Sequence, residues 1–211
     1  MKKKTLIVSL MLAFALVLGS FQAAFASFGI EGTAGDGKEL DVETAAMAMY
    51  NDAADGKYKL VDTATLKKWV NKKSAVIVDT MPAGSFAAHR IPGAINAECG
   101  DNGLNGKFTA AQKKALLKAV EKKVGKKTVT KYYNTKTKKW QTKKIKGAKT
   151  KKVKEVNKSK KIVVYCGFVK CRRSHWAAKY LVSKGYTNVY RQPGGIAAWG
   201  DAKYPIEGTD K

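Results

Sequence analysis

One short segment constrains the fold of this chain more than any other: an apolar run, then a cysteine in a basic loop, then a helical pattern. The run from Ile162 to Tyr165 predicts a buried strand, and Cys166 follows it directly. After the loop 167–173, residues 175–183 have helical spacing. A strand, a short loop and a helix in this order bring backbone N–H groups and a helix N-terminus together around the thiol. The segment therefore predicts an anion-binding loop beside a nucleophilic Cys166 of lowered pKa, with a buried structural cysteine as the alternative.

Strand and helix patterns alternate along most of the chain outside this segment. They predict strands at 58–62, 75–79 and 188–190, helices at 63–71 and near 196–199, and a short helical turn at 85–89. Thr63 is the expected N-cap of the first of these helices. Strands separated by helices predict an α/β fold, a parallel sheet with helices on both faces. Ligands bind such sheets at the carboxyl ends of the strands, which is where Cys166 lies.

The first residues have the features of a secretory signal peptide. Lysines at positions 2–4 precede an apolar run from about Leu6 to Leu18, and small residues follow at 24–26. The apolar run is shorter than the ~20 residues that span a bilayer, which disfavours a membrane anchor. We expect residues 1–26 to be removed and the mature protein to be exported, to the periplasm or the extracellular space. The rest divides into an N-terminal extension, residues 27–57, and one domain, residues 58–208, with a basic insertion at about 100–160.

Lysines are concentrated in this insertion. Residues 107–161 hold 22 lysines and only two acids, Glu121 and Glu155, in a chain whose net charge is +25. The segment begins with a helical pattern that Thr109 caps and Gly125 ends. Two β-favouring runs, 129–133 and 139–142, then flank a turn and predict a hairpin. Residues 143–161 are polar and of low complexity, which predicts an exposed linker or sheet edge.

A basic segment of this kind has three explanations. It can be a solvated face, it can bind nucleic acid, or it can attach loosely to an anionic surface of the cell envelope. An exported protein has no expected genomic role, and Tyr132, Tyr133 and Trp140 are expected to pack on the hairpin itself rather than on bases. We therefore expect no specific nucleic-acid partner, and an anionic envelope surface stays open as a partner.

Several short motifs share their order and spacing with a known family. Together they resemble the rhodanese-like domain over about residues 58–96 and 160–207. The motifs are Val78-Asp79, Phe86-Ala87-Ala88, Ile91 to Asn96, Val163 to Cys166, Ser174, Ala177-Ala178, Gly185 to Tyr190 and Gly194 to Trp199. The resemblance implies a sulfurtransferase. Such an enzyme takes a sulfane sulfur from thiosulfate or a persulfide donor onto Cys166 and passes it to a thiol or a cyanide-like acceptor.

The resemblance also implies the residues of the site. Cys166 is the expected nucleophile, and Asp79, Arg90 and Ser174 are the expected supporting residues. The basic side chains of the loop would stabilise thiosulfate and the departing sulfite. The expected anion cradle consists of Gly167, Phe168, Val169, Lys170, Cys171, Arg172 and Arg173. No cofactor and no metal are expected, because the chain has two histidines, no paired zinc-type cysteine spacing and no phosphate-binding glycine motif.

The sequence departs from the family pattern at three places. The loop between Cys166 and the pair Arg173-Ser174 is longer than the family's usual loop by two residues. Met81 stands where an arginine usually follows the strand aspartate, Asp79, and Arg90 replaces a histidine. Asp79 thus loses its usual ion-pair partner, and Arg90 is the candidate to take that place.

Three alternative functions stay open. Cys166 and Arg172 have the spacing of cysteine-dependent phosphatases and arsenate reductases, so a phosphate-sized oxyanion could occupy the loop. Cys171 could attack a persulfide or sulfenate on Cys166 and form an internal disulfide. The domain could also be a non-catalytic sulfur carrier or binding module. The third cysteine, Cys99, is expected to be an inert or exposed thiol.

Overall fold

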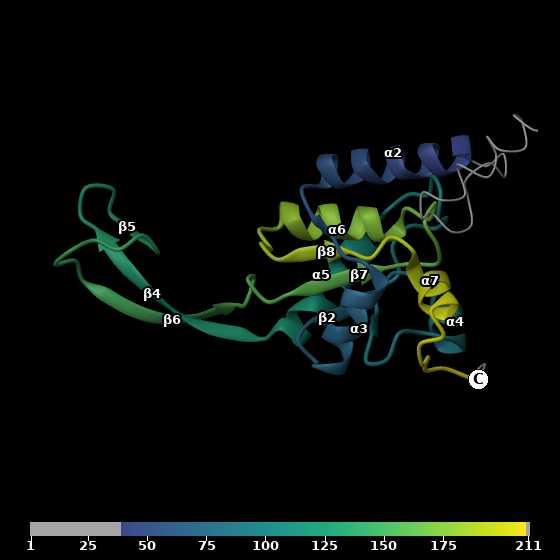
Figure 1. Ribbon diagram of the computed structural model, residues 1–211. Coiled ribbons are helices and arrows are strands. Elements are labelled where there is room, and N and C mark those ends of the chain that lie inside the picture. The colour runs from purple at the N-terminus through teal and green to yellow at the C-terminus, as the bar shows by residue number, and fades with distance from the viewer. Residues whose placement is uncertain (1–38, 210–211) are drawn as a thin grey trace, which may run out of the picture. The chain divides into compact units, whose positions relative to one another are not determined.

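Five parallel strands form the central sheet, in the order β1-β8-β7-β2-β3 (Figure 1). The computed structural model describes residues 39–209. The chain divides into two units, residues 1–48 and 49–211, and the second unit holds this sheet. The strands are β1 (Lys59–Leu60), β2 (Val76–Asp79), β3 (Ile95–Asn96), β7 (Ile162–Tyr165) and β8 (Val189–Arg191).

The side chains of the two central strands alternate between two helical layers. β2 and β7 pair in parallel, with Val76 beside Ile162 and Asp79 beside Tyr165. One face packs against α5 (Ala110–Val124) and α6 (Arg173–Ser183) through Val76, Val78, Ile162 and Val164. The other face packs against α3 (Thr63–Asn71) and α7 (Gly195–Asp201) through Ile77, Val163 and Tyr165. The predicted α/β fold with helices on both faces is confirmed.

Side-chain caps set where two of these helices begin. Thr109 and Gln112 form a capping box at the start of α5, and Gly125 ends that helix, as predicted. The expected cap of α3 is wrong, because Asp62 rather than Thr63 is its N-cap. The Asp62 carboxylate accepts a hydrogen bond from the Thr65 N–H at 2.7 Å, and this bond lowers the pKa of Asp62. Between β2 and β3 lies the short helix α4 (Ala83–Ala88).

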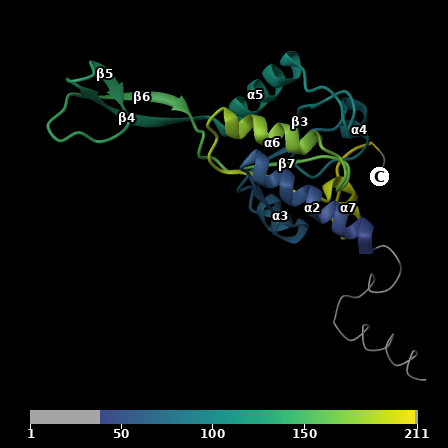
Figure 2. The ribbon, with the colours of Figure 1, turned by 90° about the horizontal axis from the view of Figure 1, so that it is seen from above.

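The lysine-rich insertion forms α5 and a second sheet of three antiparallel strands, in the order β5-β4-β6 (Figure 2). β4 (Lys126–Asn134) and β5 (Lys139–Gln141) are the predicted hairpin, with the rings of Tyr133 and Trp140 5.3 Å apart. Of the two expectations for residues 143–161, a linker or a sheet edge, β6 (Thr150–Val156) matches the second, because it is an edge strand that pairs along β4. The many lysines of β6 obscure the alternation of apolar and polar residues that is typical of a strand. Backbone hydrogen bonds to β4 stabilise the strand instead.

The segment before the domain contains a helix that the sequence patterns do not predict. Helix α2 (Glu39–Gly56) lies within the extension expected at residues 27–57, and its last residues, from position 49 on, belong to the second unit of the chain. The expected signal peptide, residues 1–26, lies outside the described residues. Of the helices in the described part of the chain, none is long and apolar enough to cross a membrane.

Candidate active site

Cys166 lies at the carboxyl end of β7, and the Cys166 loop (residues 167–172) connects it to α6. The start of the loop is fixed on α7: the Cys166 and Gly167 carbonyls accept hydrogen bonds from the N–H groups of Ile196 and Ala197 at 2.9 and 3.0 Å. Gly195 has a φ of 65°, and a side chain there would collide with the Cys166 carbonyl. The loop therefore begins from a rigid anchor at the sheet edge where ligands are expected.

The Cys166 thiol is fully buried and has three polar neighbours. It donates a hydrogen bond to the Cys171 carbonyl at 3.0 Å, and its sulfur lies 3.2 Å from the Ser174 hydroxyl. Burial raises the pKa of Cys166 well above its usual value, with the neighbouring Cys171 thiol as the next cause, while the Ser174 hydroxyl and N–H oppose the rise. The expectation that the loop lowers the pKa of Cys166 is wrong for the resting dithiol, because burial and the second thiol outweigh the N–H groups.

Cys171 is the thiol whose charge the loop favours. Its side chain is buried, and the hydrogen bond from Cys166 is the largest cause that lowers the pKa of Cys171 to about 6. Burial acts against this, while the N–H groups of Gly167 and Arg173 act with it. The opposite directions of the two shifts indicate that the thiols are coupled and that the site favours the charged form of Cys171 over that of Cys166. Both cysteines are free thiols in the structure.

Arg191 is the functional residue that sequence reasoning missed. It is fully buried at the end of β8, and its Nε donates a hydrogen bond to the Ser174 hydroxyl oxygen at 3.0 Å. Its Nη2 donates to the carbonyls of Cys171 and Val169 at 3.1 and 3.4 Å. One guanidinium therefore holds both the Ser174 hydroxyl and the Cys166 loop. Its place in the sequence could have indicated this role, because Arg191 is the last residue of a strand whose carboxyl end lies on the same side of the sheet as Cys166.

Asp52 balances the charge of this buried arginine. The Asp52 carboxylate pairs with Arg191 at 3.1 Å and with Arg172 at 2.8 Å. His175 lies beside it, with Nε2 3.8 Å from Asp52 and Nδ1 hydrogen-bonded to the Tyr58 hydroxyl at 2.9 Å. Burial lowers the pKa of His175. Asp52 comes from α2, so the part of the chain expected to lie outside the domain contributes to the site.

The two arginines of the predicted cradle are engaged elsewhere. Arg172 is paired with Asp52, and its side chain is 46% exposed. The buried Arg173 guanidinium donates to the carbonyls of Cys99, Gly100 and Asp101 and so ties α6 to the segment after β3. Besides the Cys166 thiol, the hydrogen-bond donors that lower the pKa of Cys171 are the backbone N–H groups of Gly167 and Arg173. The rest of the cradle, Phe168, Val169 and Lys170, forms an exposed rim.

Asp79 and Arg90, the two predicted supporting residues beside the loop, do not pair with each other. Asp79 is buried, accepts a hydrogen bond from the Met81 N–H at 2.8 Å, and has a pKa raised by burial. Arg90 instead pairs with Glu207 at 3.5 Å and stacks on Phe86. The idea that Arg90 replaces the missing partner of Asp79 is therefore wrong. Asp79 organises the strand end through backbone contacts.

Cys99 is separate from the other two thiols. It is buried and donates a hydrogen bond to the Ala97 carbonyl at 3.2 Å. Burial raises its pKa far above the usual range, so it is an unreactive thiol. Within residues 39–209, no group of three or more His, Cys, Asp or Glu side chains is arranged to hold a metal ion.

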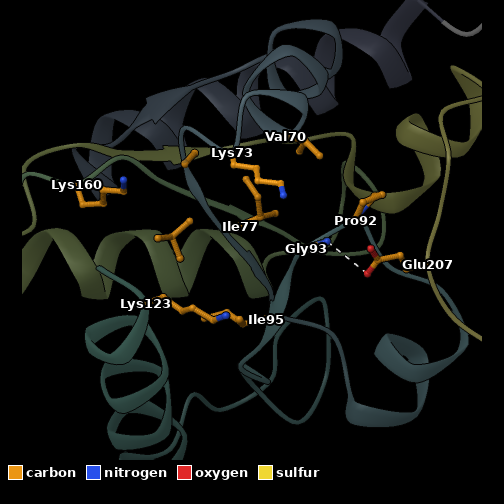
Figure 3. A pocket seen from close by; sticks show the side chains of 11 residues that line it. Val70, Lys73, Ile77, Pro92, Gly93, Ile95, Lys123, Lys160 and Glu207 are labelled. Carbon is orange, nitrogen blue, oxygen red and sulfur yellow. Dashed lines mark hydrogen bonds between the residues drawn. The ribbon is translucent and has the colours of Figure 1, made fainter. Parts of the chain in front are cut away.

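A pocket of about 530 Å³ lies at the amino ends of the sheet strands, whereas Cys166 lies at their carboxyl ends (Figure 3). It includes Val76, the first residue of β2, whereas Cys166 follows the last residue of the parallel neighbour β7. The Glu207 carboxylate accepts a hydrogen bond from the Gly93 N–H inside it, and Lys73, Lys123 and Lys160 line it (Figure 3). This pocket is distinct from the Cys166 site.

The site defines a class of protein: an α/β domain with a buried cysteine at the start of a loop whose N–H groups lower the pKa of a second thiol. The model of the rhodanese-like domain matches residues 62–202, more than half of the chain. The chain belongs to the rhodanese-like domain family.

Three solved structures are similar to this chain at low identity and with TM-scores below 0.5. A protein from Bacillus halodurans is 19% identical with a TM-score of 0.45, over 78% of this chain and 88% of its own. Thiosulfate sulfurtransferase from Pseudomonas aeruginosa is 14% identical with a TM-score of 0.48, over 78% of this chain and 23% of its own. A protein of unknown function from Rhodopseudomonas palustris, described as a possible tyrosine phosphatase, is 20% identical with a TM-score of 0.41, over 85% and 100%. A comparison with curated proteins finds no match.

Proposed function

We propose that this protein is a sulfurtransferase that carries a sulfane sulfur on Cys166. The observation that carries the proposal is the surroundings of the Cys166 sulfur. It lies beside the Ser174 hydroxyl at 3.2 Å and donates a hydrogen bond to the carbonyl of Cys171, a second cysteine whose pKa is lowered to about 6. A thiolate partner can take the Cys166 proton, and the N–H groups that now face Cys171 can hold an anion.

The first half of the cycle loads the sulfur. As thiosulfate enters, the Cys166 proton moves to the Cys171 thiolate, and the Cys166 thiolate attacks the outer sulfur of thiosulfate. The sulfur–sulfur bond of thiosulfate breaks, and sulfite leaves with its electron pair. Cys166 is left as a persulfide, whose negative charge the Ser174 hydroxyl and the loop N–H groups stabilise.

The second half of the cycle unloads it. A nucleophilic acceptor such as cyanide attacks the terminal sulfur of the persulfide, and the bond to the Cys166 sulfur breaks. Thiocyanate leaves, and the Cys166 thiolate recovers the shared proton from Cys171. Because Cys166 is fully buried behind the loop, we expect small acceptors to react faster than bulky ones.

Turnover of thiosulfate and cyanide to thiocyanate tests this function. The wild-type protein should form thiocyanate catalytically, and Cys166→Ser should abolish turnover. Cys99→Ser is the matched control, because Cys99 is also buried but contacts Ala97 rather than the loop, and it should keep most of the activity. Activity that survives Cys166→Ser, or no activity in both folded wild type and folded Cys171→Ser, would overturn the proposal.

The hypothesis of a phosphatase or arsenate reductase is disfavoured by the ion pair of Arg172 with Asp52. That chemistry places the arginine on the oxyanion, whereas the Arg172 guanidinium pairs with Asp52 at 2.8 Å. The sulfurtransferase proposal needs no such arginine, because thiosulfate is held by N–H groups.

We further propose that the mature protein is exported and that its lysine-rich sheet attaches it to anionic envelope surfaces. The lysines of β4 and β6 support this, because those at 126, 127, 151, 152 and 154 are exposed. Binding to vesicles with anionic lipid headgroups should weaken steeply with salt and with Lys151→Glu/Lys152→Glu/Lys154→Glu. Binding that is insensitive to both would contradict the attachment proposal, and an unprocessed cytosolic chain would contradict export.

A further inference from the structure

The Cys171 side chain occupies the position that an incoming anion would take. Its sulfur faces the N–H groups of Gly167 and Arg173, the donors that the proposed function assigns to the substrate. A side chain at Gly103 would touch the Cys171 sulfur, so this thiol is enclosed on the far side as well. The second thiol is therefore built into the site and is not a bystander on the loop surface.

The two thiols are also positioned to react with each other. The Cys171 carbonyl accepts a hydrogen bond from the Cys166 sulfur at 3.0 Å, and the two thiols are close enough to shift each other's pKa, upward for Cys166 and downward for Cys171. Arg191 holds that carbonyl from the other side at 3.1 Å. A sulfur added to Cys166 must share this enclosed space with Cys171.

Molecules in solvent have poor access to the two thiols. Cys166 is fully buried and Cys171 is 2% exposed, while the exposed rim consists of Phe168 and Val169, which are 50% and 40% exposed. A bulky external thiol cannot reach a persulfide on Cys166 without opening the loop. The nearest nucleophile for the Cys166 sulfur is therefore inside the protein.

We propose that Cys171 resolves the Cys166 persulfide, releasing the sulfane sulfur as hydrosulfide and closing a Cys166–Cys171 disulfide. The Cys171 sulfur attacks the Cys166 sulfur, and the bond from Cys166 to its terminal sulfur breaks. The terminal sulfur leaves with that electron pair and takes the Cys171 proton, so a persulfide anion and a thiol become a disulfide and HS⁻. In this step the Cys171 sulfur is oxidised and the sulfane sulfur is reduced, while the Cys166 sulfur keeps its oxidation state, so no external oxidant is needed.

The resolved enzyme then requires a particular class of acceptor. A disulfide between Cys166 and Cys171 returns to the dithiol through two thiols from outside, which makes a dithiol reductant the natural second substrate. The inference rests on the proposed sulfurtransferase function. It adds that the physiological product is sulfide and that the acceptor is a dithiol rather than a cyanide-like nucleophile.

Single-turnover chemistry tests this inference. Reduced protein freed of reductant is mixed with thiosulfate, sulfide is measured, and the protein is analysed by intact mass and by peptide mapping. Wild type should release about one sulfide per protein and lose two hydrogens through a bond between Cys166 and Cys171. Cys171→Ser and Cys171→Ala should release none and keep a persulfide. Cys99→Ser should behave like wild type.

The outcomes separate the two proposals. A wild-type persulfide that persists with both thiols present would overturn the role of Cys171 and leave the sulfurtransferase function standing. Sulfide release that continues in both Cys171 variants would also overturn it. No sulfur uptake by any variant would overturn the proposed function and this inference together. Because the wild-type measurement needs no substitution, a variant that fails to fold does not obscure the answer.

Discussion

The Ser174 hydroxyl lies 3.2 Å from the Cys166 sulfur and accepts a hydrogen bond from Arg191 at 3.0 Å. Because Arg191 occupies an acceptor position of that oxygen, the hydroxyl proton is free to point at the Cys166 sulfur. Ser174 is thus set to stabilise the thiolate and the persulfide.

Ser174→Ala should lower kcat/KM by roughly tenfold, about the value of one hydrogen bond to a charged group. The Ser174 hydroxyl and N–H lower the pKa of Cys166, so removing the hydroxyl should raise it and move the rising limb of the activity profile to higher pH. Steady-state kinetics across pH measure both effects. Ser183→Ala is the control, since that hydroxyl is exposed and bonds only to the Tyr180 carbonyl at 2.7 Å. An unchanged profile in Ser174→Ala would remove this role.

Arg191→Met should cost both activity and stability. The substitution frees the Ser174 hydroxyl and the loop carbonyls and leaves Asp52 without its buried partner, which costs roughly 3 kcal/mol in the free energy of unfolding. Kinetics and chemical denaturation measure the two losses. Lys179→Ala is the comparison, because Lys179 pairs with Asp55 at the surface at 2.7 Å and should have little effect. A fully active Arg191→Met would show that the guanidinium does not position the site.

Stability should depend on pH through Cys171. Its folded-state pKa is lowered from 9.0 to about 6, so the stability contributed by its thiolate is present above pH 9 and is lost as the pH falls through about 6. Denaturation of wild type and Cys171→Ser at pH 8 and pH 5 should give a difference in unfolding free energy that shrinks at the lower pH. A difference that is the same at both values would mean that Cys171 is not the charged thiol.

Arg172→Ala should leave sulfurtransferase activity within about threefold of wild type, because its contact with Asp52 is a half-exposed ion pair. The same variant discriminates the oxyanion alternative. A phosphatase or arsenate reductase activity in wild type that Arg172→Ala abolishes would favour that alternative over sulfur transfer.

The sequence predicted the parts of the fold that depend on local patterns. The apolar run before Cys166, the capping box at Thr109 and the hairpin turn near Asn134 are all encoded within a few residues. Helix α2 was not predicted, and strand β6 was predicted only as a sheet edge in alternative to a linker, because its pairing with β4 has no local pattern.

The site was predicted less completely than the fold. Position along the chain identifies Cys166, but the roles of Arg172 and Arg173 depend on which carbonyls and carboxylates lie nearby in space. Arg191 and Asp52 are 139 residues apart, so their pairing has no signature in the sequence. The opposite pKa shifts of Cys166 and Cys171 likewise depend on burial and contacts that spacing does not reveal.

The most direct test of sulfur transfer through Cys166 is intact mass after thiosulfate treatment without reductant, followed by cyanide. In the Cys171→Ser background, where the persulfide should persist, the protein should gain one sulfur atom that cyanide removes as thiocyanate. The double variant Cys166→Ser/Cys171→Ser should gain none. Sulfur uptake that survives the loss of Cys166, or no uptake in folded Cys171→Ser and wild type, would contradict the assignment of Cys166 as the sulfur carrier.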